Sequence, residues 1–222
     1  MLRLIPEPCA ELLLLGAHCD DIALGAGGTL LTLCQANLAM RVTAVVLSGG
    51  GSVREHEERC ALEAFCPQAN LEVVVLDLPD GRLPVHWARV KDTLEELRRR
   101  AAPDLIVGPS PHDAHQDHRG LSRLVPTAFR DHLTLGYEIL KWDSDLAQPN
   151  TFVPLSPVVV EEKIELLGQH YASQRDQIWF DDEAFRGLAR IRGVQCHSRY
   201  AEGFHVQKMS IGLRWTGSSG RR

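Results

Sequence analysis

The stretch L-L-L-L-G-A-H-C-D-D-I-A-L-G-A-G-G, residues 12–28, is the part of the sequence that most clearly predicts the fold. Four consecutive leucines followed by glycine are typical of a short strand that is buried on both faces. The polar residues 18–21, H-C-D-D, follow this strand at once, and a helical pattern runs from Gly27 to Leu38. A buried strand, a polar turn and a helix are the opening unit of an α/β protein.

Strand-like and helix-like segments go on alternating along the chain, which predicts a mostly parallel sheet with helices on both faces. We therefore expect a Rossmann-like three-layer α/β sandwich, formed by a single domain of residues 1–216. Residues 217–222, G-S-S-G-R-R, are expected to be a disordered tail. Further strands are predicted at 40–47, 71–76, 104–107, 135–142 and 201–207, and helices at 55–65, 87–101, 158–170, 182–191 and after the polar stretch 109–120.

Composition limits the classes of function. The chain has 222 residues, of which 44% are hydrophobic, enough for one large core. Its net charge is -5, with both signs scattered, so we expect no nucleic-acid partner and no binding to an anionic membrane. No apolar run approaches the roughly 20 residues of a transmembrane helix, and the first residues do not resemble a secretory signal. Six irregularly spaced cysteines without a C-x-x-C pair predict a cytoplasmic protein.

A second polar cluster, H-D-A-H-Q-D-H at residues 112–118, follows the strand predicted at 104–107. The carboxyl ends of parallel strands line a common crevice, so we expect this cluster to meet residues 18–21 there. Imidazole and carboxylate together suit Zn²⁺, and a catalytic zinc keeps three protein ligands and one open position. The plainer interpretation is two polar loops whose histidines cap helices or face water. The position of both clusters after predicted strands favours the metal site.

The same residues resemble a known family. The segment G-A-H-C-D-D-I-A-L-G-A-G-G, residues 16–28, is similar to the A-H-P-D-D-x-x-x-G-x-G-G motif of the zinc-dependent N-acetylglucosaminyl deacetylases related to PIG-L and LmbE. H-Q-D-H at 115–118 matches their second motif, H-x-D-H. R-E-H-E at 54–57 resembles the family's R-x-x-E, and Y-A-S-Q at 171–174 and Y-A-E-G-F at 200–204 also agree.

The resemblance implies a role for each matching residue. His18, Asp21 and His118 would bind the zinc, and Asp20 would be the general base for the attacking water. His115 would stabilise the oxyanion, with protonation of the leaving amine as a further role. Asp117 would orient a histidine, with His115 as the expected partner, and would keep that imidazole protonated at neutral pH. Arg54 would contact a hydroxyl or phosphate of the substrate.

One residue departs from the family pattern: Cys19 stands where proline is usual, so the loop loses a fixed φ. We expect Cys19 to be no ligand. The glycines at 25, 27 and 28 lack the third glycine of a dinucleotide-binding fingerprint, and close packing of the first helix is the favoured interpretation. For S-G-G-G-S at 48–52 a plain turn is favoured over a phosphate cradle. For Trp142 core packing is favoured over stacking on a sugar ring.

The predicted function is hydrolysis of an N-acetyl group on an amino sugar, a sugar nucleotide or a sugar conjugate, with Zn²⁺ as cofactor. Two alternatives stay open: an amidase acting on thiol conjugates at the same site, and a non-catalytic domain that binds sugars or nucleotides. The expected partner is a small N-acetylated sugar. The sequence leaves open whether the chain forms a homo-oligomer.

Overall fold

The computed structural model describes residues 9–37 and 40–210. In this part of the chain seven strands form one sheet, in the order β3-β2-β1-β4-β5-β7-β6. Strands β1 to β5 are parallel to one another, whereas β7 is antiparallel to β5 and β6. The predicted, mostly parallel sheet is thus confirmed. The strands are β1 (Glu11–Gly16), β2 (Arg41–Ser48), β3 (Asn70–Leu78), β4 (Leu105–Pro109), β5 (Leu133–Tyr137), β6 (Thr151–Leu155) and β7 (Tyr200–His205).

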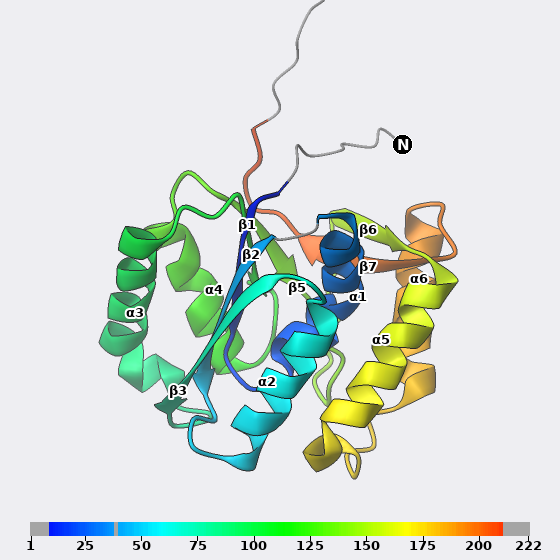
Figure 1. Cartoon of the computed structure of the whole chain (residues 1–222), viewed down its shortest axis with the longest axis horizontal. Helices are drawn as coiled ribbons and strands as arrows, with labels where there is room; N and C mark the ends of the chain where they lie inside the picture. Colours follow the sequence, from blue (N-terminus) through cyan, green and yellow to red (C-terminus); the bar gives the residue numbers. More distant parts are fainter. Residues whose placement is uncertain (1–8, 38–39, 211–222) are drawn as a thin grey trace, which may run out of the picture.

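Helices cover both faces of the sheet, as expected. Figure 1 shows α3 and α4 on one side of the strands and α1, α2, α5 and α6 on the other. The four leucines of β1 explain this arrangement, because alternate side chains point to opposite faces of a strand. Leu12 and Leu14 lie in the core beneath α1, α2 and α5, and Leu13 and Leu15 lie in the core beneath α3 and α4. The helices are α1 (Asp21–Ala36), α2 (Val53–Phe65), α3 (Trp87–Arg100), α4 (Gln116–Ala128), α5 (Pro157–His170) and α6 (Asp182–Gln195), with short 3-10 helices η1 (Leu83–His86) and η2 (Ala172–Gln174).

The glycines of α1 let the helix lie close to its neighbours. A Cβ atom on Gly25 would lie 2.4 Å from the Tyr137 ring, and one on Gly27 would lie 2.7 Å from Phe65. At Gly28 the nearest atom would be 2.5 Å away, on Leu155. Such distances leave no room for a side chain, so the favoured interpretation of these glycines as packing residues is confirmed.

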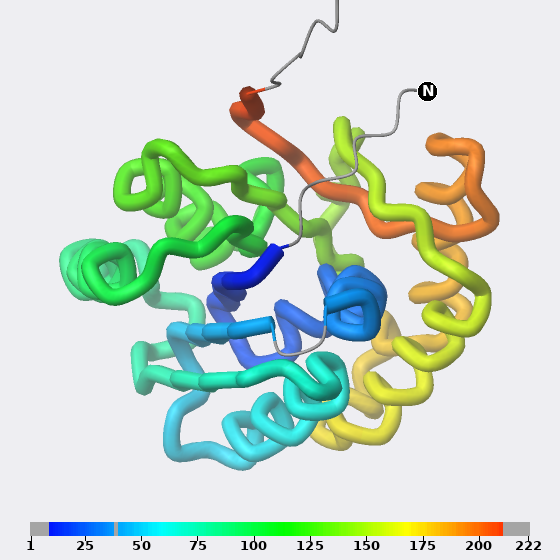
Figure 2. Tube along the Cα trace, turned by 45° about the horizontal axis from the view of Figure 1, so that its top comes forward, coloured from blue at the N-terminus to red at the C-terminus, as the bar shows by residue number. Residues whose placement is uncertain are grey.

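The strand order places the two polar clusters together. β1 pairs with β2 on one side and with β4 on the other. Successive strands are therefore added toward one edge of the sheet from β1 to β3 and toward the opposite edge from β4 onward. The carboxyl ends of strands at such a switch point form the usual binding crevice of an open α/β sheet. Residues 18–21 follow β1 and residues 112–118 follow β4. In Figure 2 the first described residues, which lead into β1, lie near the middle of the view, and the last described residues lie at its top.

Several predicted boundaries were wrong. α1 begins at Asp21, not at Gly27, and β5 ends at Tyr137, so the predicted strand 135–142 stops early. β6 was not predicted at all. The expected tail at 217–222 lies outside the described residues. Within the described residues no helix is long and apolar enough to cross a bilayer.

Candidate active site

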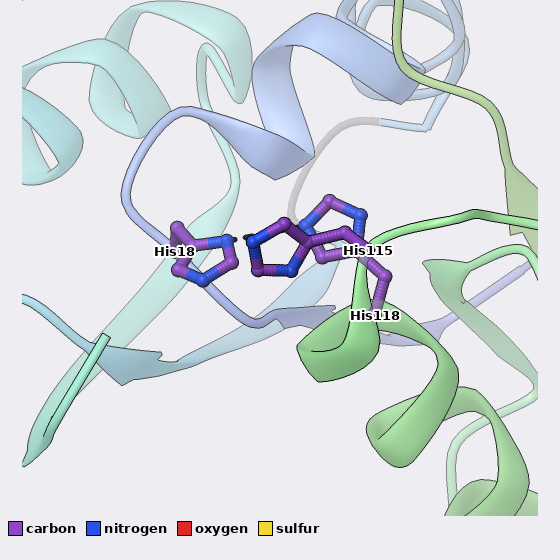
Figure 3. A group of neighbouring side chains, drawn as sticks. All are labelled: His18, His115 and His118. Carbon is purple, nitrogen blue, oxygen red and sulfur yellow. Dashed lines mark hydrogen bonds between the residues drawn. The ribbon is translucent and has the colours of Figure 1, made fainter. Parts of the chain in front are cut away.

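Three potential ligand atoms form a small buried triangle at the carboxyl edge of the sheet. His18 lies in the loop after β1, Asp21 is the first residue of α1, and His118 lies in the first turn of α4. His18 Nδ1 is 3.1 Å from His118 Nε2. Asp21 Oδ2 is 3.2 Å from His118 Nε2 and 3.6 Å from His18 Nδ1. Figure 3 shows the two imidazoles pointing toward each other from the β1 loop and from α4.

The size of this triangle can be compared with the needs of a metal. A tetrahedral zinc with ligand bonds of about 2.0–2.1 Å places its ligand atoms roughly 3.3 Å apart. The three sides of the triangle lie close to this value. Imidazole nitrogens and a carboxylate oxygen are also ligands that zinc accepts. This buried His–Asp–His group therefore fits a metal ion.

A second donor set shares two of these residues. Ligand atoms of His18, His115 and His118 also lie within 4.8 Å of one another, and Figure 3 shows His115 beside His118. The Asp21 carboxylate is the more firmly fixed third member, because its Oδ2 accepts hydrogen bonds from the backbone of Ala17 and His18, each at 2.9 Å. Burial alone would raise the pKa of Asp21, but His118 and His18 hold it well below its usual range. We therefore favour Asp21 as the third ligand.

His18 and His118 each have one ring nitrogen in the triangle and one outer ring nitrogen, which points away from it. Carboxylates contact both outer nitrogens. His118 Nδ1 is 2.8 Å from Asp113 Oδ2, and His18 Nε2 is 3.0 Å from Asp80 and 3.2 Å from Asp117. Metal-binding histidines usually make such contacts, which fix the tautomer and the orientation of the ring. The expected pairing of Asp117 with His115 is wrong, since the Asp117 carboxylate contacts His18.

The Asp117 carboxylate is itself held in place. Its two oxygens accept hydrogen bonds from the backbone of Gly81, at 2.8 Å, and Leu83, at 3.0 Å. These contacts connect the loop after β3 to α4. Asp117 thus contacts a histidine, as the family resemblance implies, but that histidine is His18, in the loop after β1.

Asp20 lies beside the triangle in an unusual backbone conformation. Its φ is 103°, a value that side chains other than glycine rarely adopt. Although Asp20 precedes α1, its carboxylate does not cap the helix; it accepts a hydrogen bond from Arg54 at 3.0 Å. Burial raises the pKa of Asp20 to about 7, and Arg54 partly offsets this rise. A buried carboxyl in this position suits the proposed general base.

His115 is the residue that caps the amino end of α4. Its Nδ1 accepts a hydrogen bond from the Asp117 backbone N–H at 3.3 Å, so in the neutral imidazole the proton lies on Nε2. The expected rise in the pKa of His115 is wrong. Burial lowers this pKa, and the neighbouring His118 and His18 lower it further. His115 can therefore donate a hydrogen bond through Nε2 as a neutral ring.

Arg54 faces the loop that carries the candidate site. Its Nη2 donates to the carbonyl of Cys19 and to Asp20. The preceding loop, residues 48–52, is a turn: the N–H of Gly50 donates to Leu76 and that of Gly51 to Glu55. Because these backbone donors are already used, the favoured interpretation of a plain turn holds.

Sequence reasoning missed several residues around the site. Asp113 belongs to the polar cluster at residues 112–118, but the sequence predicted no role for it. The sequence signal for Asp80 was only its position after a predicted strand. Glu58 had no signal in the sequence, because its contact with Tyr171 joins positions 113 residues apart. Trp142 was assigned to the core and is 71% exposed, so that assignment is wrong. It follows Lys141, whose Nζ is 3.0 Å from Asp113.

The shorter pieces of the family resemblance meet in space. Tyr171 donates to Glu58 at 2.7 Å, and Ser173 donates to Glu57 through its N–H at 2.9 Å and its hydroxyl at 2.6 Å. The Y-A-S-Q segment thus packs on α2 at the last residue of R-E-H-E, Glu57, and at the residue that follows it, Glu58. In β7, Glu202 accepts hydrogen bonds from the backbone of Gly28 and Thr29 in α1. These motifs hold α1 and α2 around the site.

Comparisons with known proteins agree with this geometry. The PIG-L family, described as GlcNAc-PI de-N-acetylase, matches residues 13–129, more than half of the chain. The diacetylchitobiose deacetylase of Thermococcus kodakarensis is 26% identical over 221 residues, covering 87% of this chain and 81% of that protein. The uncharacterized deacetylase YaiS of Escherichia coli is 31% identical over 163 residues, covering 68% and 80%.

Solved structures show the same fold at lower identity. The N,N′-diacetylchitobiose deacetylase of Pyrococcus horikoshii superposes with a TM-score of 0.68 at 22% identity, covering 90% of this chain and 84% of that one. The 4-carboxy-2-hydroxymuconate hydratase GalB of Pseudomonas putida gives 0.70 at 18% identity, covering 93% and 99%. Since one of these neighbours is named a hydratase, the fold alone does not identify the reaction. The family match and the 31% identical relative show that the chain belongs to the PIG-L family.

Proposed function

We propose that this protein is a zinc-dependent hydrolase that removes the acetyl group from the nitrogen of an N-acetylglucosamine-type substrate. The observation that supports this most strongly is the triangle of His18, Asp21 and His118 beside the buried carboxyl of Asp20. Hydrolysis of an amide needs an electrophile at the carbonyl oxygen and a base for the attacking water, and this arrangement supplies both. Two relatives carry the name deacetylase, and one of them is named for diacetylchitobiose.

The residues proposed to hold the zinc are His18, Asp21 and His118. When bound, the ion supplies Lewis-acid polarisation of the amide carbonyl and lowers the pKa of water toward about 7. Asp113, Asp80 and Asp117 hold the outer nitrogens of the two histidines and so fix the direction of their inner nitrogens.

The chain's own residues carry the proton transfers. Asp20 takes a proton from water as the water oxygen bonds to the acetyl carbon. His115 donates a hydrogen bond from Nε2 to the carbonyl oxygen, where negative charge develops. As the C–N bond breaks, Asp20 passes its proton to the sugar nitrogen, and acetate and a free amine leave. We assign this transfer to Asp20, because the Nδ1 of His115 accepts a hydrogen bond and burial lowers the pKa of its ring.

Two solvent-accessible side chains, one of them partly buried, are proposed to contact the sugar. Arg54 Nη1 makes no hydrogen bond within the described residues and only approaches Asp80, at 3.9 Å. It is available for a hydroxyl or phosphate of the substrate. Trp142 presents an exposed ring on a loop that Lys141 ties to Asp113, and we propose that this ring stacks on the sugar.

A substrate panel tests the proposed function. Zinc-loaded protein is incubated with N-acetylglucosamine, N,N′-diacetylchitobiose, UDP-N-acetylglucosamine and an N-acyl glucosamine thiol conjugate, with Asp20→Asn as the matched control. We expect acetate and free amine in equal amounts from at least one acetylated sugar. Amine release from the thiol conjugate alone would favour the amidase alternative. Binding of a sugar without release of acetate would favour a non-catalytic domain.

A further inference from the structure

Side chains of α2 form hydrogen bonds with both polar groups, the C=O and the N–H, of the peptide that joins Cys19 to Asp20. Arg54 donates to the carbonyl oxygen of Cys19, and Glu58 Oε2 accepts the backbone N–H of Asp20 at 2.8 Å. Arg54 and Glu58 are four residues apart, so both lie on one face of the helix. This peptide immediately precedes the proposed base and the proposed ligand Asp21, and its orientation sets the direction of both side chains.

The Glu58 carboxyl is buried and uses only one of its two oxygens. The side chain is 0% exposed. Oε2 accepts both the Asp20 N–H and the Tyr171 hydroxyl, the latter at 2.7 Å. Oε1 has no hydrogen-bond partner within residues 9–37 and 40–210. Burial also raises the pKa of Tyr171 well above its usual range, so Tyr171 stays a donor.

A carboxyl group in such a place has an energetic cost, because Oε1 is buried without a partner. What the site gains is one acceptor for two buried donors. One of these donors belongs to the residue with a φ of 103°. A rare backbone conformation of this kind persists only where the surrounding structure holds it. Arg54 and Glu58 maintain this conformation, because one binds the carbonyl oxygen and the other the N–H of the same peptide.

We propose that Glu58 is a positioning residue, which fixes the Cys19–Asp20 peptide through the Asp20 N–H and thereby aims the Asp20 carboxylate at the reacting amide. The catalytic consequence rests on the proposed function, whereas the hydrogen bond itself does not. Tyr171 acts behind Glu58 and keeps Oε2 turned toward Asp20.

Glu58→Met tests the proposal, because methionine is similar in length and volume but offers no strong acceptor. Glu57→Met is the matched control: Glu57 is the adjacent buried glutamate on α2 and binds Ser173 instead of Asp20. Glu58→Gln is the conservative variant, since its amide oxygen can accept both donors. Exchange of the Asp20 amide hydrogen is followed by NMR, and kcat and KM are measured for acetate release from N,N′-diacetylchitobiose by zinc-loaded protein.

We expect Glu58→Met to speed exchange of the Asp20 amide by at least about 10-fold and to lower kcat by roughly 10- to 100-fold with little change in KM, as expected for a displaced catalytic group. Glu58→Gln should restore most of both properties, whereas Glu57→Met should leave exchange of the Asp20 amide near the wild-type rate and should lower kcat much less than Glu58→Met does. Glu58→Met leaves two buried donors, the Asp20 N–H and the Tyr171 hydroxyl, without their acceptor. If this variant does not fold, the double variant Glu58→Met/Tyr171→Phe, which lacks the Tyr171 hydroxyl, takes its place in the same measurements.

Two results would overturn the proposal. One is exchange of the Asp20 amide at the wild-type rate when Glu58 is methionine. The other is a loss of kcat that is equal in Glu57→Met and Glu58→Met, which would reveal a general effect of packing. If the wild-type protein releases no acetate, the proposed function fails, and amide exchange alone decides whether Glu58 holds the peptide.

Discussion

The backbone of Asp20 adopts a φ of 103°, a conformation that glycine would adopt with less strain. A carboxylate at this position indicates that its chemistry outweighs the backbone strain, which for one such residue is of order 1–3 kcal/mol. The neighbours of Asp20 maintain the conformation: Glu58 holds its N–H, and Arg54 holds both its carboxylate and the preceding carbonyl. At this residue, the site thus combines a strained backbone conformation with the hydrogen bonds that maintain that conformation.

Asp20→Asn tests the proposed base. Asparagine has nearly the same shape and leaves the metal-binding triangle intact, but it cannot take a proton from water. We expect zinc content near wild type and a kcat reduced by roughly 10²-fold or more, the usual scale for loss of a general base. Metal analysis and initial rates measure the two quantities. Loss of zinc together with activity would make Asp20 a ligand, and full activity would remove it from the mechanism.

His115→Ala distinguishes the two donor sets that share His18 and His118. If His115 only donates a hydrogen bond to the carbonyl oxygen, its loss should lower kcat much more than it raises KM, because the bond strengthens in the transition state. Zinc content should not change. His115→Gln keeps a donor and should recover part of the rate. A His115→Ala protein that loses its zinc would place His115 among the ligands in place of Asp21.

At the scale of the elements, α1 and α2 carry the site because they pack closely on their surroundings. α1 begins directly at Asp21, and its glycines allow Tyr137, Phe65 and Leu155 to contact the helix backbone. α2 presents Arg54 and Glu58 to the loop before α1. Any displacement of α1 would therefore move the proposed ligand at its first position.

Gly25→Ala tests this close packing. The new methyl carbon would lie 2.4 Å from the Tyr137 ring, and overpacking of this kind typically costs about 1–3 kcal/mol in the free energy of unfolding. Gly168→Ala in α5 is the matched control, since a Cβ there meets no atom within 4 Å. It should stabilise the protein by roughly 0.5–1 kcal/mol. Urea unfolding compares the two variants, and equal effects of the two substitutions would contradict the packing account.

At the scale of the whole molecule, the sheet and the meeting of the two polar clusters could be predicted from the sequence. The buried leucines of β1, the alternation of strands and helices and the position of each cluster after a strand are local signals. β6 was missed because it is a short edge strand with Pro154 inside it, which reads as a loop. Glu58 was missed because its partners Asp20 and Tyr171 come from distant segments that only the folded chain brings together.

The stability of the whole molecule should depend on the ionisation of Glu58. Burial raises the pKa of this carboxyl from 4.5 to about 8. Between these values the folded state keeps a proton that the unfolded state has released, so stability falls as the pH rises from about 5 to 8. Glu58→Gln removes this contribution. We expect the stability of Glu58→Gln relative to wild type to increase over that range in urea unfolding, and a constant difference would contradict the assignment.

We propose that a metal held by His18, Asp21 and His118 makes this chain a deacetylase. The most direct test is to titrate metal-free protein with zinc while measuring acetate release from N,N′-diacetylchitobiose. Activity should rise until about one zinc is bound per chain and then reach a plateau. His118→Ala should bind little zinc and stay inactive over the same range, because two ligands hold a catalytic zinc poorly. Full activity of the metal-free protein, or full zinc occupancy in His118→Ala, would contradict the claim.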